Sequence, residues 1–247
     1  MIKIENVEVM GWEHAIRGIR NPMNSWEKSD SGICKGGDDG IGCENCANYD
    51  SCEHTYDHSW QLGKADHDLM MRLADTRYRR MITVNLDITA PLYWWKDFYT
   101  YEVGTVANSC STMHKITAKE FEWSDFSTEH LLNFGMWGEQ FTDADAIYAP
   151  AKTMGCVISA LNGARDRYLD FKSRGSEWTE LAKRAWWQMT QLLPSSYNQK
   201  WTVMLNYEVL AGIYPMLINH ELDEWVKFCK LIEALPYSDI IIGRVWR

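Results

Sequence analysis

The chain has 247 residues and a formal net charge of −9, a length that suits one large domain. Hydrophobic residues make up 46% and charged residues 24%, which excludes intrinsic disorder as the main state. The acidic balance argues against binding to nucleic-acid backbones, and no stretch resembles a membrane span or a secretory signal, so we expect a soluble cytoplasmic protein without nucleic-acid or membrane partners.

The first half of the chain shows three periodic segments. A helix is predicted over residues 12–20, ending near Asn21-Pro22 because a residue before proline avoids the helical conformation. A second helix is predicted over 66–74, where apolar residues have helical spacing. Residues 81–88 alternate between apolar and polar side chains, which predicts a half-buried strand.

The next segments combine aromatic, helical and polar patterns. Thr89, Ala90 and Pro91 predict a helix start with a capping hydroxyl and an early proline, followed by an aromatic stretch over 92–101. Residues 104–112 are small and polar, which predicts a loop. The remaining elements expected are a helix over 178–193 that ends before Pro194, a short strand or a helix start over 201–205, and a final helix over 222–232.

A cysteine-rich insertion is expected over residues 31–60 within a single domain that spans 1–247. Its cysteines follow the pattern Cys34-x8-Cys43-x2-Cys46-x5-Cys52, with His54 and His58 close behind. Four thiolates would close the tetrahedral coordination of a structural zinc ion, with the two histidines as alternates. An iron–sulfur cluster, a redox pair and a metal-free loop with reduced thiols are the other interpretations.

The charges of this insertion also argue against nucleic-acid binding. A single Lys35 faces five carboxylates, at positions 38, 39, 44, 50 and 53.

Residues 90–116 resemble the central segment of the flavin-dependent thymidylate synthases, in which a strand and Ala-Pro lead into an aromatic helix and an Arg-His-Arg-x7-Ser motif. Residues 193–225 resemble the C-terminal region of that family, with Asn206 at the start of its Asn-x-Arg motif, and residues 15–21 resemble its N-terminal Ala-x-Arg segment. The resemblance implies an α/β (α+β) domain with helices packed on a small sheet. It also implies a homotetramer that binds FAD and dUMP between subunits and methylates uracil at C5 with reduced flavin, NADPH and methylene-tetrahydrofolate.

The chain departs from the family at most of the matched positions where the family holds a phosphate. The Arg-His-Arg positions hold Thr100, Tyr101 and Glu102, the motif serine position holds Cys110, and the other expected arginine positions hold Thr112, Thr190, Glu208 and Leu217. Phosphates require charge-assisted donors, and a carboxylate reverses the local field. We therefore expect the family's dUMP and FAD sites to be absent in their usual form.

Several polar residues remain as candidates for binding a ligand. They are Asn108, Ser109, Ser111, Thr112, His114 and Lys115, the pair Arg17 and Arg20 on the first helix, and Asn206. Each set also has a structural interpretation, because hydroxyls and amides satisfy turns and arginines cover solvated helix faces. Cys110 is a weak candidate nucleophile, since a small buried thiol is the more frequent role for such a residue.

Two functions follow from these patterns. The first is a diverged thymidylate synthase-like protein that binds a pyrimidine nucleotide or a related small ligand at an inter-subunit cleft and, if active, transfers a one-carbon unit to C5 with reduced flavin. The second is a non-catalytic homo-oligomer that binds a small molecule or a protein on the same scaffold, as an accessory protein of the kind that phages encode.

Overall fold

The computed structural model describes residues 2–34, 45–49, 59–101, 103–110, 116–132 and 149–243. The chain divides into two compact units. The first comprises Met1–Ile4, Asp87–Thr100 and Asn108–Thr202, and the second comprises Glu5–Leu86, Tyr101–Ala107 and Val203–Arg247.

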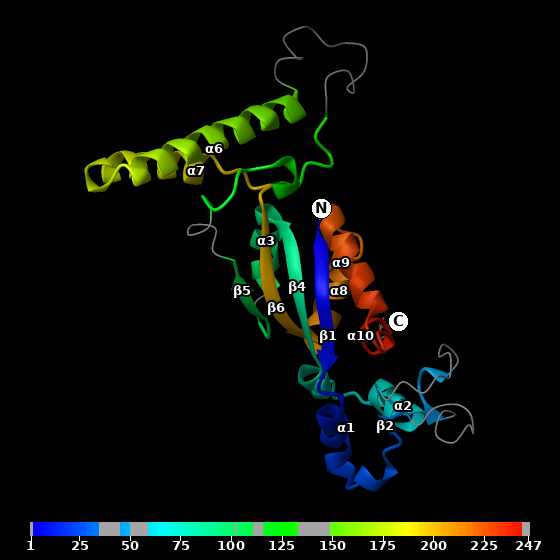
Figure 1. Ribbon diagram of the computed structural model, residues 1–247. Coiled ribbons are helices and arrows are strands. Elements are labelled where there is room, and N and C mark those ends of the chain that lie inside the picture. The colour runs from blue at the N-terminus through cyan, green and yellow to red at the C-terminus, as the bar shows by residue number, and fades with distance from the viewer. Residues whose placement is uncertain are drawn as a thin grey trace, which may run out of the picture. The chain divides into compact units, whose positions relative to one another are not determined.

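A four-stranded sheet has the order β1-β4-β6-β5 (Figure 1). The strands are β1 (Lys3–Met10), β4 (Thr83–Pro91), β5 (Val106–Ser109) and β6 (Asn198–Asn206). Val84, Leu86 and Ile88 are buried on one face of β4, which confirms the predicted alternation. Residues 201–205 belong to β6, so of the two elements expected there, a short strand or a helix start, the strand is confirmed. The loop predicted over 104–112 is wrong in part, because β5 lies within it as an edge strand beside β6.

The predicted helix start at Thr89 is also wrong, since Thr89 lies inside β4 and its hydroxyl caps no helix. Helix α3 spans Leu92–Phe98 and has no side-chain cap. Its first two N–H groups donate instead to the backbone carbonyls of Tyr197 and Ser195, at 3.0 Å each. Backbone groups from a distant loop therefore satisfy the donors that a local hydroxyl was expected to satisfy.

The helices of the second unit are α1 (Trp12–Arg20), α2 (Lys64–Arg72), α8 (Tyr207–Leu217), α9 (Asp223–Ala234) and α10 (Asp239–Ile242), with a 3-10 segment at Arg77–Met81. The helices predicted over 12–20, 66–74 and 222–232 are confirmed, with small shifts at the ends. Two short antiparallel strands, β2 (Gly32–Ile33) and β3 (Trp60–Gln61), enclose most of the cysteine-rich segment. That segment itself lies largely outside the described residues.

Gly11 forms the turn between β1 and α1. Its φ of +97° is a conformation that side chains rarely adopt, and a Cβ built on it would lie 1.9 Å from the carbonyl oxygen of Met81. Only glycine allows the chain to turn this closely against the 3-10 segment.

The first unit contains two long helices that pack side by side (Figure 1), α6 (Pro150–Ser173) and α7 (Thr179–Leu192). The helix predicted to end before Pro194 is confirmed as α7. The core of the first unit is an apolar cluster of Ile116, Phe121, Phe126, Met154, Ile158, Leu161 and Met189. The expected mixed fold, with helices packed on a small sheet, is confirmed. None of the helices in the described ranges combines the length and apolarity needed to cross a membrane.

Candidate functional site

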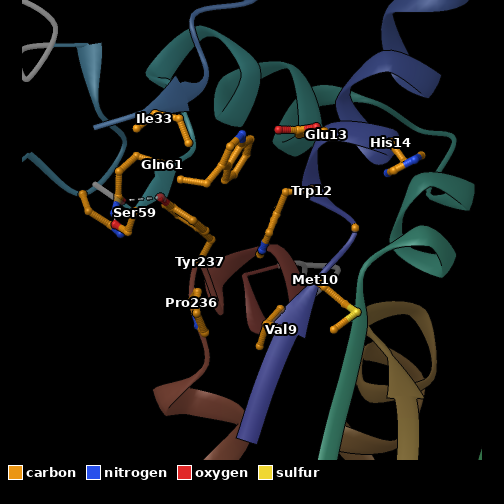
Figure 2. A pocket seen from close by; sticks show the side chains of 13 residues that line it. Val9, Met10, Trp12, Glu13, His14, Ile33, Ser59, Gln61, Pro236 and Tyr237 are labelled. Carbon is orange, nitrogen blue, oxygen red and sulfur yellow. Dashed lines mark hydrogen bonds between the residues drawn. The ribbon is translucent and has the colours of Figure 1, made fainter. Parts of the chain in front are cut away.

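A cavity of about 630 Å³ opens in the second unit beside the start of α1 (Figure 2). Three aromatic residues line it, namely Trp12, Trp60 and Tyr237. The Trp12 and Trp60 rings are stacked at a centroid distance of 6.1 Å, and the Tyr237 ring meets Trp12 edge-on at 5.1 Å. Cavities with aromatic walls and a few fixed polar groups are the usual form of small-molecule sites.

Gln61 presents the fixed polar group of this cavity. Its Nε2 donates to Ser59 Oγ at 2.6 Å, and its Oε1 accepts a hydrogen bond from Tyr237 Oη at 3.0 Å, as Figure 2 shows. These two contacts fix the amide plane. Gln61 Oε1 also accepts a hydrogen bond from Cys46 Sγ at 3.8 Å, so both acceptor positions of the oxygen are in use. One of the two amide N–H bonds of Gln61 has no partner among the described contacts and can donate to a ligand.

Tyr237 is held in a strained conformation at the rim of the cavity. Its φ is +51°, which is uncommon for a residue with a side chain. The Leu62 N–H donates to its hydroxyl at 2.8 Å, while Pro236 accepts a hydrogen bond from Tyr207 Oη at 2.5 Å. Burial raises the pKa of Tyr207 above its usual value, so this phenol stays protonated and keeps donating. Strain of this kind persists only where the surroundings fix it, as they do at many ligand sites.

A second cavity, of about 330 Å³, adjoins the first. The two share Glu13, Ile33 and Trp60 as lining residues and so lie next to each other, and we refer to the two cavities together as the groove. Arg17 lines the second cavity, is exposed, and has no ion-pair partner among the described residues. The first cavity of the groove therefore holds aromatic walls and a fixed amide, the second holds the Arg17 guanidinium, and Glu13 lines both.

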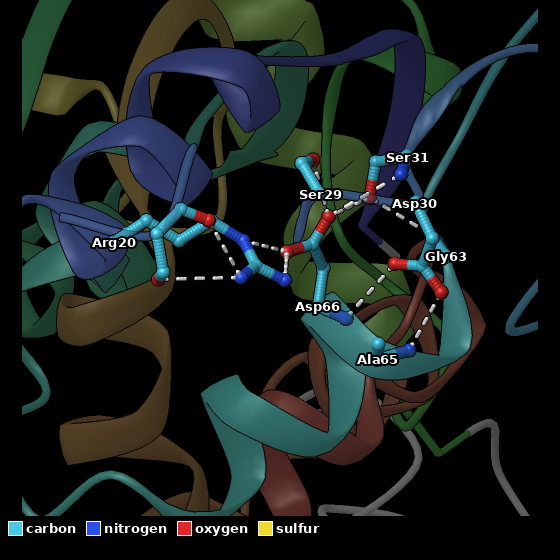
Figure 3. Close-up of polar contacts among 8 residues, drawn as sticks. Arg20, Ser29, Asp30, Ser31, Gly63, Ala65 and Asp66 are labelled. Carbon is cyan, nitrogen blue, oxygen red and sulfur yellow. Dashed lines mark hydrogen bonds and ion pairs between the residues drawn. The ribbon is translucent and has the colours of Figure 1, made fainter. Parts of the chain in front are cut away.

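Arg20, the other predicted anion ligand of α1, is differently placed. It is buried, and its guanidinium contacts the Asp66 carboxylate and donates to the Ser25 carbonyl (Figure 3). Burial alone would raise the pKa of Asp66, but hydrogen bonds from Ser31, Ser29 and Arg20 outweigh it and lower that pKa. The pair stays charged and holds α1 against α2. Arg20 therefore has a structural partner, and its anion-binding role stays a prediction.

Asn206 forms the N-cap of α8. Its side-chain oxygen accepts from the Val209 N–H at 3.0 Å, and its Nδ2 donates to the Gly104 carbonyl at 3.3 Å. Both contacts are structural, and its ligand-binding role stays a prediction.

The polar segment 108–115, which begins inside β5, is described only in part. Asn108, Ser109 and Cys110 are exposed, and the Cys110 backbone is hydrogen-bonded to Lys200 and Gln199. The structure thus brings these three to the edge of the sheet. The predicted ligands Ser111, Thr112, His114 and Lys115 lie outside the described residues.

The metal prediction is also described only in part. Cys34 is half-buried and Cys46 is buried, neither forms a disulfide with another described cysteine, and Cys46 Sγ donates to Gln61 Oε1 at 3.8 Å. Cys43, Cys52, His54 and His58 lie outside the described residues. Among the residues that the structure does describe, no three His, Cys, Asp or Glu side chains gather into a metal site.

The residues at the positions where the resemblance places phosphate ligands do not fit a flavin diphosphate or a nucleotide phosphate. Thr100 and Thr190 donate to backbone carbonyls of their own helical turns, and Leu217 is fully buried. Glu208 accepts a hydrogen bond from Thr76 at 3.2 Å. None of these side chains supplies a positive charge, and Glu208 would repel an anion.

Comparison with solved structures identifies the fold. The chain is similar to thymidylate synthase X (ThyX) of Helicobacter pylori, solved with FAD and dUMP, at 15% identity and a TM-score of 0.55, with all of both chains covered. A second structure, the flavin-dependent thymidylate synthase ThyX of the same organism complexed with FAD and dUMP, gives 16% identity and a TM-score of 0.52, covering 97% of this chain and 98% of that one. No protein-family model and no curated protein matches the sequence.

These likenesses show that the chain has the fold of the flavin-dependent thymidylate synthases, as the motif resemblance implies. Of the residues that form the groove, the sequence singled out Arg17 and the structurally engaged Arg20. It missed Gln61 and Tyr237, which meet across 176 positions of the chain. The one local signal is the Ser-Trp-Gln run at 59–61, a polar and aromatic cluster where a polar loop ends.

Proposed function

We propose that this protein binds a pyrimidine nucleotide, or a ligand of the same build, in the groove of its second unit. The observation that carries the proposal is the fixed Gln61 amide between aromatic walls, with the Arg17 guanidinium, which pairs with no described carboxylate, in the adjoining cavity. A uracil ring offers carbonyl oxygens along its edge, and these match the amide N–H of Gln61 that has no partner among the described contacts. Aromatic side chains provide a surface for the faces of the ring.

The remaining parts of a nucleotide match the rest of the groove. Glu13 lines both cavities and would accept hydrogen bonds from sugar hydroxyls, the role that a carboxylate plays beside a ribose in dinucleotide sites. Arg17 would receive the phosphate, for which a planar guanidinium is well suited. The likeness to ThyX structures solved with dUMP supports a nucleotide as the ligand.

We propose binding rather than flavin chemistry. The C5 transfer implied by the resemblance requires reduced flavin, and the described residues at the family's phosphate positions do not fit that cofactor. Colourless protein that takes up neither FAD nor FMN is the expected result. Purification as a yellow protein with flavin absorbance would contradict it.

Calorimetric titration with dUMP and with uridine tests the proposal. Arg17→Gln is expected to weaken dUMP binding about tenfold and leave uridine binding unchanged, because only dUMP carries the charge that Arg17 meets. Gln61→Leu is expected to weaken both ligands about tenfold, since both present the same base edge.

Lys230→Gln is the matched control, because Lys230 is an exposed cation on α9 outside the groove. Equal loss of dUMP and uridine binding in Arg17→Gln would overturn the placement of the phosphate. No binding of dUMP by the intact protein would overturn the proposed function.

Two further properties belong to this proposal. We propose that the protein is a homo-oligomer, a tetramer by the resemblance, and α7 leaves Leu181, Trp187 and Leu192 exposed as apolar contact surface. Mass measurement by light scattering tests this, and a monomer at micromolar concentration would refute it.

We also propose that Cys34, Cys43, Cys46 and Cys52 hold a structural zinc ion. Metal analysis of protein purified without added zinc should find one zinc per chain, and fully folded metal-free protein would refute the site.

A further inference from the structure

A separate groove of about 960 Å³ lies in the first unit, where α6 ends and α7 begins. Its lining includes Lys172, Lys183, Tyr168, Trp186 and Ser176. All of these residues belong to the first unit, so the groove is distinct from the nucleotide pocket of the second unit.

The charge of this groove is unusual for an acidic chain. Both of its charged lining side chains are lysines, and no carboxylate of a described residue lines it. Neither lysine forms an ion pair with a described residue. One carboxylate on each helix is engaged elsewhere, since Asp170 pairs with Arg174 at 2.8 Å and Glu180 lies 3.5 Å from Arg184. Two lysine side chains therefore line one cavity without an ion-pair partner among the described residues, in a protein whose net charge is −9.

The groove also presents flat apolar surface beside these charges. Trp186 is half-buried, packing against the core cluster of the first unit while also lining the groove. Lys172 Nζ lies 5.5 Å from the centroid of the Tyr168 ring, which keeps this ammonium close to an aromatic wall. Ser176 adds a hydroxyl donor. An anion joined to a flat ring would meet all three kinds of group.

We propose that this groove binds a small phosphorylated aromatic molecule. The phosphate lies between Lys172 and Lys183, where it receives two charge-assisted hydrogen bonds, and the ring packs against Trp186. The site is independent of the proposed nucleotide pocket, and no covalent step is involved.

Calorimetric titration with phenyl phosphate and methyl phosphate tests this proposal. Phenyl phosphate is expected to bind more tightly than methyl phosphate, because only the former has a ring to pack on Trp186. Lys172→Gln and Lys183→Gln are each expected to weaken phenyl phosphate binding about tenfold. Lys152→Gln, an exposed cation of α6 outside the groove, is the matched control. Binding is also expected to weaken as salt is raised.

The Arg17→Gln variant separates this site from the nucleotide pocket. Phenyl phosphate binding that survives Arg17→Gln and is lost in the Lys172→Gln, Lys183→Gln double variant supports the groove. Binding lost in Arg17→Gln but kept in the double variant would overturn it, as would no binding by the intact protein at low salt. The double variant should keep its circular dichroism spectrum and its dUMP titration, which shows that any loss is local.

Discussion

The guanidinium of Arg20 contacts a single carboxylate oxygen of Asp66, with Nε 2.6 Å and Nη2 2.5 Å from Oδ1. The other carboxylate oxygen accepts hydrogen bonds from the hydroxyls of Ser29 at 2.7 Å and Ser31 at 2.6 Å (Figure 3). Both charged side chains are buried. This contact joins α1, the segment before β2, and α2, and therefore fixes one wall of the groove proposed to bind the nucleotide.

Removing the Asp66 carboxylate should destabilise the protein strongly. Asp66→Ala leaves a buried guanidinium without its counter-charge, which costs about 3–5 kcal/mol of unfolding free energy. Asp68→Ala is the control, since Asp68 lies on the same helix and forms an exposed pair with Arg72 at 3.0 Å. That change should cost less than about 1 kcal/mol in the same urea titration. Equal effects of the two changes would contradict the structural role of the buried pair.

Gly11 and Gly18 provide a matched pair of glycine-to-alanine changes. Gly11→Ala should destabilise the protein by several kcal/mol, because its Cβ would collide with the Met81 carbonyl and its φ is positive. Gly18→Ala in α1 meets Met81 Sδ at an ordinary 3.5 Å and should stabilise the helix by about 0.5–1 kcal/mol. Thermal unfolding distinguishes the two signs, and a neutral Gly11→Ala would show that the turn is not as close as described.

The ion pair of His67 with Asp239 predicts a pH dependence of stability. The hydrogen bond to Asp239, 2.7 Å from His67 Nε2, raises the pKa of His67 above 6.5, although burial opposes the shift. The same hydrogen bond lowers the pKa of Asp239 below 3.8. The histidine contribution is fully present below pH 6.5 and is lost as the pH rises through the higher folded-state pKa, while the aspartate contribution is lost below pH 3.8.

We therefore expect the stabilising effect of this pair to be greatest between pH 4 and 6.5. The melting temperature of the wild type minus that of His67→Gln should be larger at pH 5.5 than at pH 8.5. Subtracting the melting temperature of His67→Gln separates the contribution of this pair from that of other carboxylates that titrate at low pH. A difference that does not change across this range would rule out the protonated pair.

Asn206 allows its structural and ligand-binding roles to be separated. Asn206→Ala should cost about 1 kcal/mol, because it removes the cap of α8. Asn206→Ser keeps a capping oxygen and should recover most of that stability. If Asn206 only caps the helix, dUMP affinity stays unchanged in Asn206→Ser. Loss of affinity in a variant with recovered stability would instead place Asn206 in the binding site.

Local patterns predicted most of the elements with strong periodicity. The alternation in β4 and the helical spacing in α7 were sufficient because burial follows directly from those periods. The pattern missed β5, whose Val106–Ser109 run is small and mostly exposed, as an edge strand allows. It also misplaced the start of α3, because the donors there are satisfied by a loop about a hundred residues away in sequence.

The candidate site was much less predictable. Arg17 could be named because it and Arg20 lie three residues apart on the first predicted helix and so share one helix face. The aromatic end of the groove could not be predicted, since Gln61 and Tyr237 come from distant parts of the chain and neither lies in a distinctive motif. The resemblance to the thymidylate synthases identified the fold, and the altered phosphate positions indicated that the family's ligand contacts would not be found in place.

The position of Gln61 on β3 has a consequence for how the site can be altered. Helix α1 supplies Trp12, Glu13 and Arg17 to the groove. The Gln61 amide comes instead from β3, a two-residue strand at the end of the cysteine-rich segment. A substitution of Gln61 would therefore change the hydrogen bonding of the proposed site without altering any side chain of the central strands β4 and β6. The polar group of the proposed site and the strands that build the sheet lie in different stretches of the sequence, so one can be changed without the other.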